Sequence, residues 1–119
     1  MRILKVNKKG ELVRENGLLV FAEGVDAIVQ LITQKLQVIK GEWFFNLDLG
    51  VDYFNVIFPK QTSDFKRFIE FRKTIDTVPG VVKVTSMQIE VVDARKRHYK
   101  ITAKITTDLG IIDYEEVLV

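Results

Sequence analysis

Apolar and polar residues follow three different patterns along the chain, and the first pattern predicts short strands. From Ile3 to Phe21, brief apolar stretches alternate with charged residues and turn formers. The pair Asn16-Gly17 is a hairpin signal because both residues tolerate positive φ. A set of short N-terminal strands is therefore expected.

The second pattern is helical and occurs twice. The first helix is expected to begin after Gly24, with Lys40 in its last turn and Gly41 as its end. The second helix is expected to run from about Ser63 to Val78, with Thr62 or Ser63 as the N-cap. Its predicted buried stripe consists of Phe65, Phe68, Ile69 and Ile75.

The third pattern is a two-residue alternation in the last third of the chain, typical of strands in a hairpin meander. In the first two strands of this meander, core-facing residues lie opposite each other only if the residue numbers of each pair add up to an even value. In the second and third strands, the two residue numbers must add up to an odd value. Glu90 is then expected beside Lys100, and Lys104 beside Glu115. The parity of the apolar positions changes near Thr85-Ser86, which predicts a β-bulge there.

These elements predict an α+β fold: short N-terminal strands, two helices and a C-terminal three-stranded antiparallel meander. The 119 residues have the length of one domain, so we expect a single domain over residues 1–119. Hydrophobic residues at 47% and charged residues at 29% are typical of soluble globular proteins, and no apolar stretch is long enough to span a membrane.

Composition excludes several kinds of chemistry. The chain has no cysteine and one histidine, so disulfides, thiolate metal sites, cysteine nucleophiles and sites that need two imidazoles are absent. A net charge of +2 is too small to favour nucleic acid. We expect no cofactor.

Aromatic residues are crowded into one part of the chain. Nine of the twelve lie between positions 43 and 71, more than one loop and one helix stripe bury easily in a small domain. This crowding predicts that some of them, Trp43, Phe54 and Phe58 in particular, contact a partner. The alternative interpretation is an aromatic cluster packed under the loop.

Three carboxylates in the same region, Glu42, Asp48 and Asp52, resemble the acid and nucleophile of a glycosidase. The sequence shows neither the defined separation nor the cleft that such a pair requires. Turn formation by Asp48 and Gly50, and a buried ion pair of Glu42 with a nearby Lys or Arg, explain these residues without catalysis. Calcium is disfavoured because the glycine and distal glutamate of an EF-hand loop are missing from their places. We expect no catalytic and no metal-binding residues.

Two charged segments remain. Arg95, Lys96, Arg97 and Lys100 form a basic cluster at a predicted hairpin tip, but no aromatic stacking ladder accompanies it, so nucleic acid is not predicted as a partner. The last twelve residues carry four acids and no base, and they end on an apolar strand that can leave a sheet edge for another chain. The residues expected to meet a partner at this edge are Ile111, Asp113, Glu115, Val117 and Val119.

Short motifs in a specific order link the chain to a known family. They are GEWF (Gly41 to Phe44), DLG (Asp48 to Gly50) and PGV (Pro79 to Val81). With this order and spacing, nearly the whole chain resembles the small baseplate wedge proteins, or sheath initiators, of contractile-tailed phages and related injection machines. The motif residues to which the resemblance gives structural roles are Gly41, Glu42, Trp43, Phe44, Asp48, Gly50, Pro79 and Gly80.

The resemblance implies structural work rather than catalysis. The implied partners are the sheath protein, whose arms add to the sheet as strands, the baseplate wedge subunits, and tail-tube or hub proteins. The implied locations are the host cytoplasm during assembly and the tail baseplate afterwards. Some relatives carry a lysozyme label, so the alternative hypothesis is a small peptidoglycan hydrolase that uses Glu42 with Asp48 or Asp52.

A prediction concerns Trp43, the only tryptophan in the chain. If this side chain contacts a partner, its fluorescence in the isolated protein will be accessible to quenchers and will shift to the blue on assembly. Blue-shifted emission that resists quenchers and does not change on assembly would assign Trp43 to the core.

Overall fold

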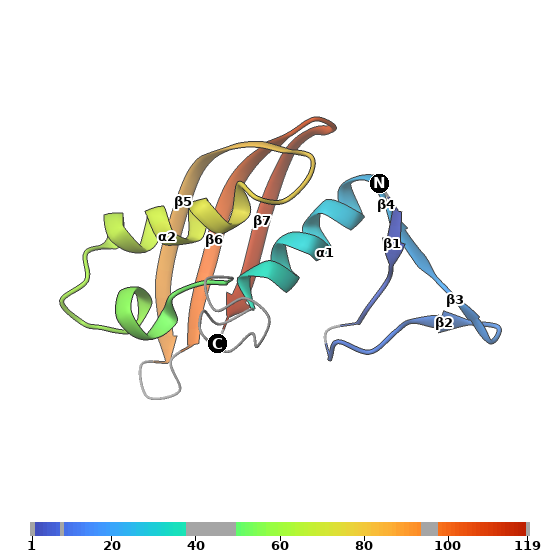
Figure 1. Cartoon of the computed structure of the whole chain (residues 1–119), viewed down its shortest axis with the longest axis horizontal. Coiled ribbons are helices and arrows are strands. Elements are labelled where there is room, and N and C mark those ends of the chain that lie inside the picture. The colour runs from blue at the N-terminus through green and yellow to red at the C-terminus, as the bar shows by residue number, and fades with distance from the viewer. Residues whose placement is uncertain (1, 8, 38–49, 94–97, 119) are drawn as a thin grey trace.

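The helices of this protein pack against a three-stranded antiparallel sheet (Figure 1). The structure is a computed structural model that describes residues 2–7, 9–37, 50–93 and 98–118. The sheet consists of β5 (Val81–Asp93), β6 (His98–Thr107) and β7 (Gly110–Leu118), in that order. Helices α1 (Gly24–Leu36) and α2 (Asp64–Ile75) lie against one face of it, and an N-terminal arm of short strands lies beyond α1 (Figure 1). The predicted α+β fold with a C-terminal meander is confirmed.

The pairing of β5 with β6 follows the predicted even sum. Ile89 lies opposite Ile101, and Glu90 lies opposite Lys100. The register shifts between Val84 and Ser86, so the bulge expected near Thr85-Ser86 is present. Two further shifts, between residues 81 and 83 and between residues 91 and 93, make β5 an irregular strand.

The pairing of β6 with β7 follows the predicted odd sum without interruption from Thr107 and Gly110 to Tyr99 and Leu118. One detail of the prediction was wrong. Lys104 lies opposite Asp113, and the ion pair of Glu115 is with Lys100, 2.8 Å from Nζ to Oε1. Lys100 and Glu115 are diagonal neighbours on the same face, a separation that a long lysine side chain spans.

The core fills the space between the helices and the sheet. Ile28, Ile32 and Leu36 of α1 are buried, as are Phe71 and Ile75 of α2. The β6 and β7 residues of the helix-facing parity complete this core: Tyr99, Ile101, Ala103, Ile105, Ile112 and Tyr114. Burial of one sheet face therefore explains the two-residue alternation.

An aromatic cluster forms part of this core. The π-helical turn η1 (Tyr53–Ile57) places the Tyr53 ring 5.5 Å from the Phe58 ring and 6.1 Å from the Phe71 ring. Phe58 also stacks on Tyr99 at 5.9 Å. Several of the crowded aromatics are thus packed against one another, as the alternative interpretation expected.

Both helices end earlier than predicted. α1 ends at Leu36 with Gln37 as C-cap, and the basic residue in its last turn is Lys35. Lys40 and Gly41 lie outside the described residues. α2 ends at Ile75, three residues before Val78. Its start is as predicted, since Ser63 is the N-cap and its hydroxyl accepts a hydrogen bond from the Lys66 amide at 3.3 Å.

The predicted buried stripe of α2 was wrong at two positions. Phe65 is 68% exposed and Ile69 is exposed, whereas Phe71 is fully buried. With 100° per residue, residues 68, 71 and 75 fall within one narrow sector of the helix, and residues 65 and 69 lie in the neighbouring sector. The helix has two apolar stripes, and docking on the sheet buries the stripe of Phe68, Phe71 and Ile75.

The N-terminal arm (residues 2–23) contains, in its described part, two small antiparallel strand pairs and an isolated bridge between Val6 and Leu12. β1 (Arg2–Leu4) pairs with β4 (Phe21–Glu23), and β2 (Arg14–Glu15) pairs with β3 (Leu18–Leu19). The predicted hairpin is present, with φ of 51° at Asn16 and 77° at Gly17. The Gln30 side chain ties the arm to α1, because its Nε2 donates to Leu4 O at 2.8 Å and its Oε1 accepts from Val6 N at 3.1 Å.

The orientation of α2 yields a prediction. Phe71→Ala removes a fully buried ring and should lower the free energy of unfolding by about 3–5 kcal/mol. Phe65→Ala, the matched change on the exposed stripe, should change it by less than about 0.5 kcal/mol. Urea denaturation followed by circular dichroism measures both, and equal losses would contradict this orientation of the helix.

Candidate docking site

The last strand, β7, forms one edge of the sheet. Within the described residues it pairs with β6 only. Thr107 and Gly110 flank a two-residue turn, and the residues that flank such a turn form a hydrogen-bonded pair. Because hydrogen-bonded pairs alternate, the backbone groups of Ile111, Asp113, Glu115 and Val117 point away from β6. An incoming strand finds donors and acceptors at these four residues.

The side chains of the same four residues lie on the outer face of the sheet, opposite the helices. Ile111 is 74% exposed and Val117 is 48% exposed, and Asp113 and Glu115 are also exposed. The hydrogen bond from Lys100 to Glu115 raises the pKa of Lys100. Val119, the fifth residue predicted at this edge, lies outside the described residues.

Tyr114 anchors β7 to α1 from the inner face. Its hydroxyl lies 2.8 Å from Thr33 Oγ1. Burial, and to a smaller extent the charge of Glu116, raises the pKa of Tyr114 to about 12. A second tyrosine hydroxyl, that of Tyr53, donates to Leu36 O, and burial raises the pKa of Tyr53. The Tyr114 hydroxyl thus ties the C-terminal half of α1 to the sheet, and the Tyr53 hydroxyl ties it to η1.

The opposite edge, β5, is less suited to strand addition. Its three register shifts interrupt the row of backbone groups and twist the strand, a device by which proteins blunt exposed edges. β7 has no register shift along its nine residues. Between the two edges, β7 is the regular one.

The remaining predicted site residues fall into two groups. Gly41, Glu42, Trp43, Phe44 and Asp48 lie outside the described residues, as does the side chain of Phe54. The hypotheses that pair Glu42 with Asp48 or Asp52, or with a basic side chain, therefore stay predictions. Phe58 is half-buried and packs against the core. The Asp52 amide donates to Glu70 Oε1 at 3.0 Å, which ties the segment before η1 to α2.

The motif residue Gly80 has a clear structural role. Its φ is +93°, and a Cβ at this position would lie 2.9 Å from Ile28 Cδ1 of α1. Its carbonyl accepts a hydrogen bond from the Asp108 amide at 2.9 Å, next to the turn that leads into β7. The Pro79-Gly80 turn thus contacts both α1 and the β6–β7 hairpin. Its backbone comes so close to Ile28 that only glycine fits at position 80. The other motif glycine in the described part, Gly50, has φ +102°.

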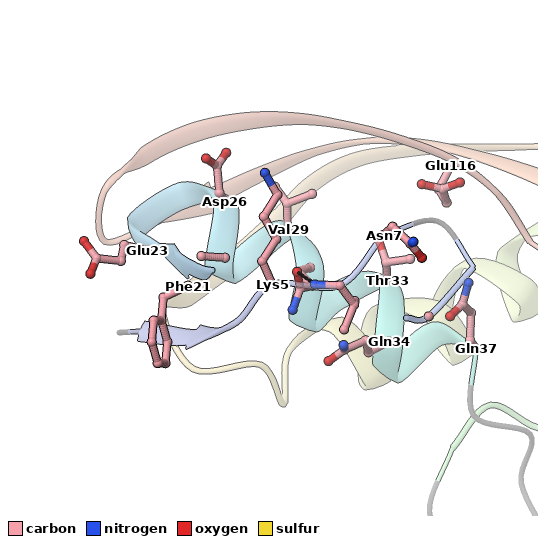
Figure 2. A pocket seen from close by; sticks show the side chains of 14 residues that line it. Lys5, Asn7, Phe21, Glu23, Asp26, Val29, Thr33, Gln34, Gln37 and Glu116 are labelled. Atoms are coloured by element: carbon pink, nitrogen blue, oxygen red, sulfur yellow. Dashed lines mark hydrogen bonds between the residues drawn. The ribbon is translucent and has the colours of Figure 1, made fainter. Parts of the chain in front are cut away.

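The structure also contains a groove of about 480 Å³ that sequence reasoning missed. It is lined by the arm, one side of α1 and Glu116 of β7 (Figure 2). Glu116 has the helix-facing parity of Ile112 and Tyr114 and is only partly exposed. That parity was a signal in the sequence, because a carboxylate at an inward position of a strand needs a polar environment.

Three further observations concern metal-binding groups, membrane spans and the basic cluster. No group of three metal-binding side chains occurs among them, and neither helix there is long and apolar enough to cross a membrane. In the basic cluster, Arg95, Lys96 and Arg97 lie outside the described residues. The fourth member, Lys100, is paired with Glu115.

Comparison with known proteins identifies the family. The family model for the contractile injection system sheath initiator matches residues 2–110, nearly the whole chain. The chain belongs to the sheath-initiator family. A search of curated proteins gave no match.

Membership of the sheath-initiator family assigns a structural role in a contractile injection system and a place in the baseplate of the assembled tail. The match ends at Gly110, where β7 begins, so β7 as a docking edge is argued from the structure of this chain.

The Tyr114 anchor predicts a loss of stability at alkaline pH. Tyrosine in the unfolded chain has a pKa of about 10. The stability that the buried Tyr114 phenol adds is therefore complete below pH 10 and is lost as the pH rises toward 12, because the unfolded state ionises first. The free energy of unfolding should fall by about 2–3 kcal/mol from this residue across that interval. In Tyr114→Phe, the decrease should be smaller by this amount, as measured by urea denaturation at each pH.

Thr33→Val is the matched control for this prediction. It removes the hydrogen bond to Tyr114 but keeps the buried phenol, so it should lower stability at every pH and retain the alkaline decrease. An equal pH slope in wild type and Tyr114→Phe would show that Tyr114 ionises as readily folded as unfolded.

Proposed function

We propose that this single-domain sheath initiator starts sheath assembly by offering the free edge of β7 to an extended arm of a sheath subunit. The observation that carries this proposal is the regular edge at Ile111, Asp113, Glu115 and Val117, which pairs with no other strand among the residues that the structure describes. Strand addition at such an edge gains affinity from backbone hydrogen bonds along its whole length. The β-sheet itself, not a catalytic site, is then the functional unit.

Side chains at the edge contribute selectivity. Asp113 repels a second β7 edge that pairs antiparallel, because acidic side chains would then face each other across the two strands. Glu115 contributes less to this repulsion, since Lys100 is paired with it. Both carboxylates attract a strand with basic side chains. Exposed Ile111 and Val117 at the two ends of the row supply apolar contact area. The edge is thus protected against self-association and open to a basic arm.

The N-terminal arm is the surface that we assign to the wedge subunits of the baseplate. It contains two-stranded pairs, which are marginally stable without further packing. It also carries exposed large apolar side chains: Leu4, Leu12, Leu18, Leu19 and Phe21. A surface of this kind is typical of an interface. The arm lies on the far side of α1 from the core (Figure 1), so arm and sheet can bind different partners.

Asp113→Pro tests the docking edge. The Asp113 amide points away from β6, so proline removes no hydrogen bond of the sheet but deletes a donor for the incoming strand. We expect a folded protein, with its melting temperature within a few degrees of wild type, that enters the baseplate and no longer starts a sheath. Electron microscopy of assembled tails measures the outcome.

Asp113→Asn is the control, because it removes the same charge and keeps the amide. It should support sheath growth. Normal sheath growth from folded Asp113→Pro would refute docking at β7 and would direct attention to the N-terminal arm.

A further inference from the structure

The groove seen in Figure 2 lies between the free edge of β7 and the N-terminal arm. Two contacts of α1 define its sides, since Thr33 bonds to Tyr114 of β7 and Gln30 bonds to the backbone of the arm. Asp26 and Gln37 occupy the helix surface between these two directions, given 100° per residue. Both residues line the groove, so its floor is the side of α1 that neither β7 nor the arm covers.

A strand added to β7 would pass over this groove. Neighbouring strands lie about 4.8 Å apart, and successive side chains point to opposite faces of the sheet. Side chains of the added strand that point to the helix side would therefore enter the space next to Glu116, whose own side chain lines the groove. The groove is therefore the space beside β7 that would receive the inward-pointing side chains of such a strand.

The charges in the groove favour a cation. Its lining contains one amine, that of Lys5, and three carboxylates, of which Glu116 lies toward the end of the groove near Gln37, and Glu23 and Asp26 lie toward the opposite end (Figure 2). Glu23 forms an ion pair with Arg2 at 3.6 Å, whereas the ion pairs of the described residues include neither Asp26 nor Glu116. Gln34 and Gln37 add side-chain amides that can accept hydrogen bonds from an ammonium or a guanidinium group. A volume of about 480 Å³ accommodates a lysine or arginine side chain with water.

We propose that this groove binds one lysine or arginine side chain of the sheath arm that adds to β7, with Glu116 as its carboxylate partner. The inference rests on the proposed strand addition and goes beyond it, because it places a basic residue on the inner face of the arm and names Glu116 as its partner on β7. Backbone pairing at the outward amides supplies affinity, and the groove sets the register of the arm along β7.

The test uses the purified chain and the sheath protein of the same injection system. Binding is measured at low and at high salt for wild type, Glu116→Gln and Asp113→Asn. Glu116→Gln should weaken binding about tenfold at low salt and reduce the salt dependence, because one partly desolvated ion pair is lost. Asp113→Asn, a matched change on the outer face of the same strand, should weaken binding by less than about threefold.

A double-mutant cycle identifies the partner side chain. Each lysine and arginine of the sheath arm is replaced by glutamine and combined with Glu116→Gln. One arm variant should lose no further affinity in this combination, which marks it as the occupant of the groove. Additive losses for every arm variant would overturn the proposal, as would wild-type affinity of Glu116→Gln.

Asp113→Pro separates a failure of the groove from a failure of strand addition. If Asp113→Pro abolishes binding and Glu116→Gln binds like wild type, strand addition holds and the groove proposal fails. If Asp113→Pro binds like wild type, or the wild-type chain does not bind the sheath protein, both proposals fail.

Discussion

The structure depends on burial of a single face of a three-stranded sheet. In the described part of the chain, α1, α2 and the segment around η1 cover β5, β6 and β7, and the two helices lie on the same side of the sheet (Figure 1). Every helix-facing position of β6 from Tyr99 to Ile105 must therefore be apolar, and a slip of one residue would expose the whole set. This constraint fixes the register of both hairpins, and with it the backbone groups that point outward from β7.

Three contacts, with the turn before β5, with β7 and with η1, convert this register into a defined position for α1. Ile28 packs against the Gly80 turn, Thr33 bonds to Tyr114, and the Leu36 carbonyl accepts from Tyr53. These contacts leave the neighbouring side of α1, which carries Gln30, free to hold the arm. The groove is a consequence of this division, since neither β7 nor the arm covers the strip of helix between them.

The two edges of the sheet differ in a way that suits a strand-accepting protein. β5 carries register shifts, which disrupt pairing, while β7 is regular and acidic. A sheet edge that accepts a strand, as proposed for β7, must not pair with the same edge of a second copy of the chain. Negative charge at Asp113, and to a smaller extent at Glu115, offers protection against such pairing without blocking a basic strand. The same charges that limit aggregation therefore favour the proposed sheath arm.

Local sequence determined most of the fold. Parity fixed the strand pairing and the Thr85 bulge, Ser63 fixed the start of α2, and Asn16-Gly17 fixed a hairpin, because each depends on backbone preferences or on a two-residue period. Tertiary packing decided the rest. α2 has two apolar stripes, and only its docking on the sheet selected Phe71 for burial over Phe65. The pairing of Glu115 with Lys100 and the groove beside Glu116 depend likewise on where separate elements meet in space, which the spacing of residues along one strand or helix does not specify.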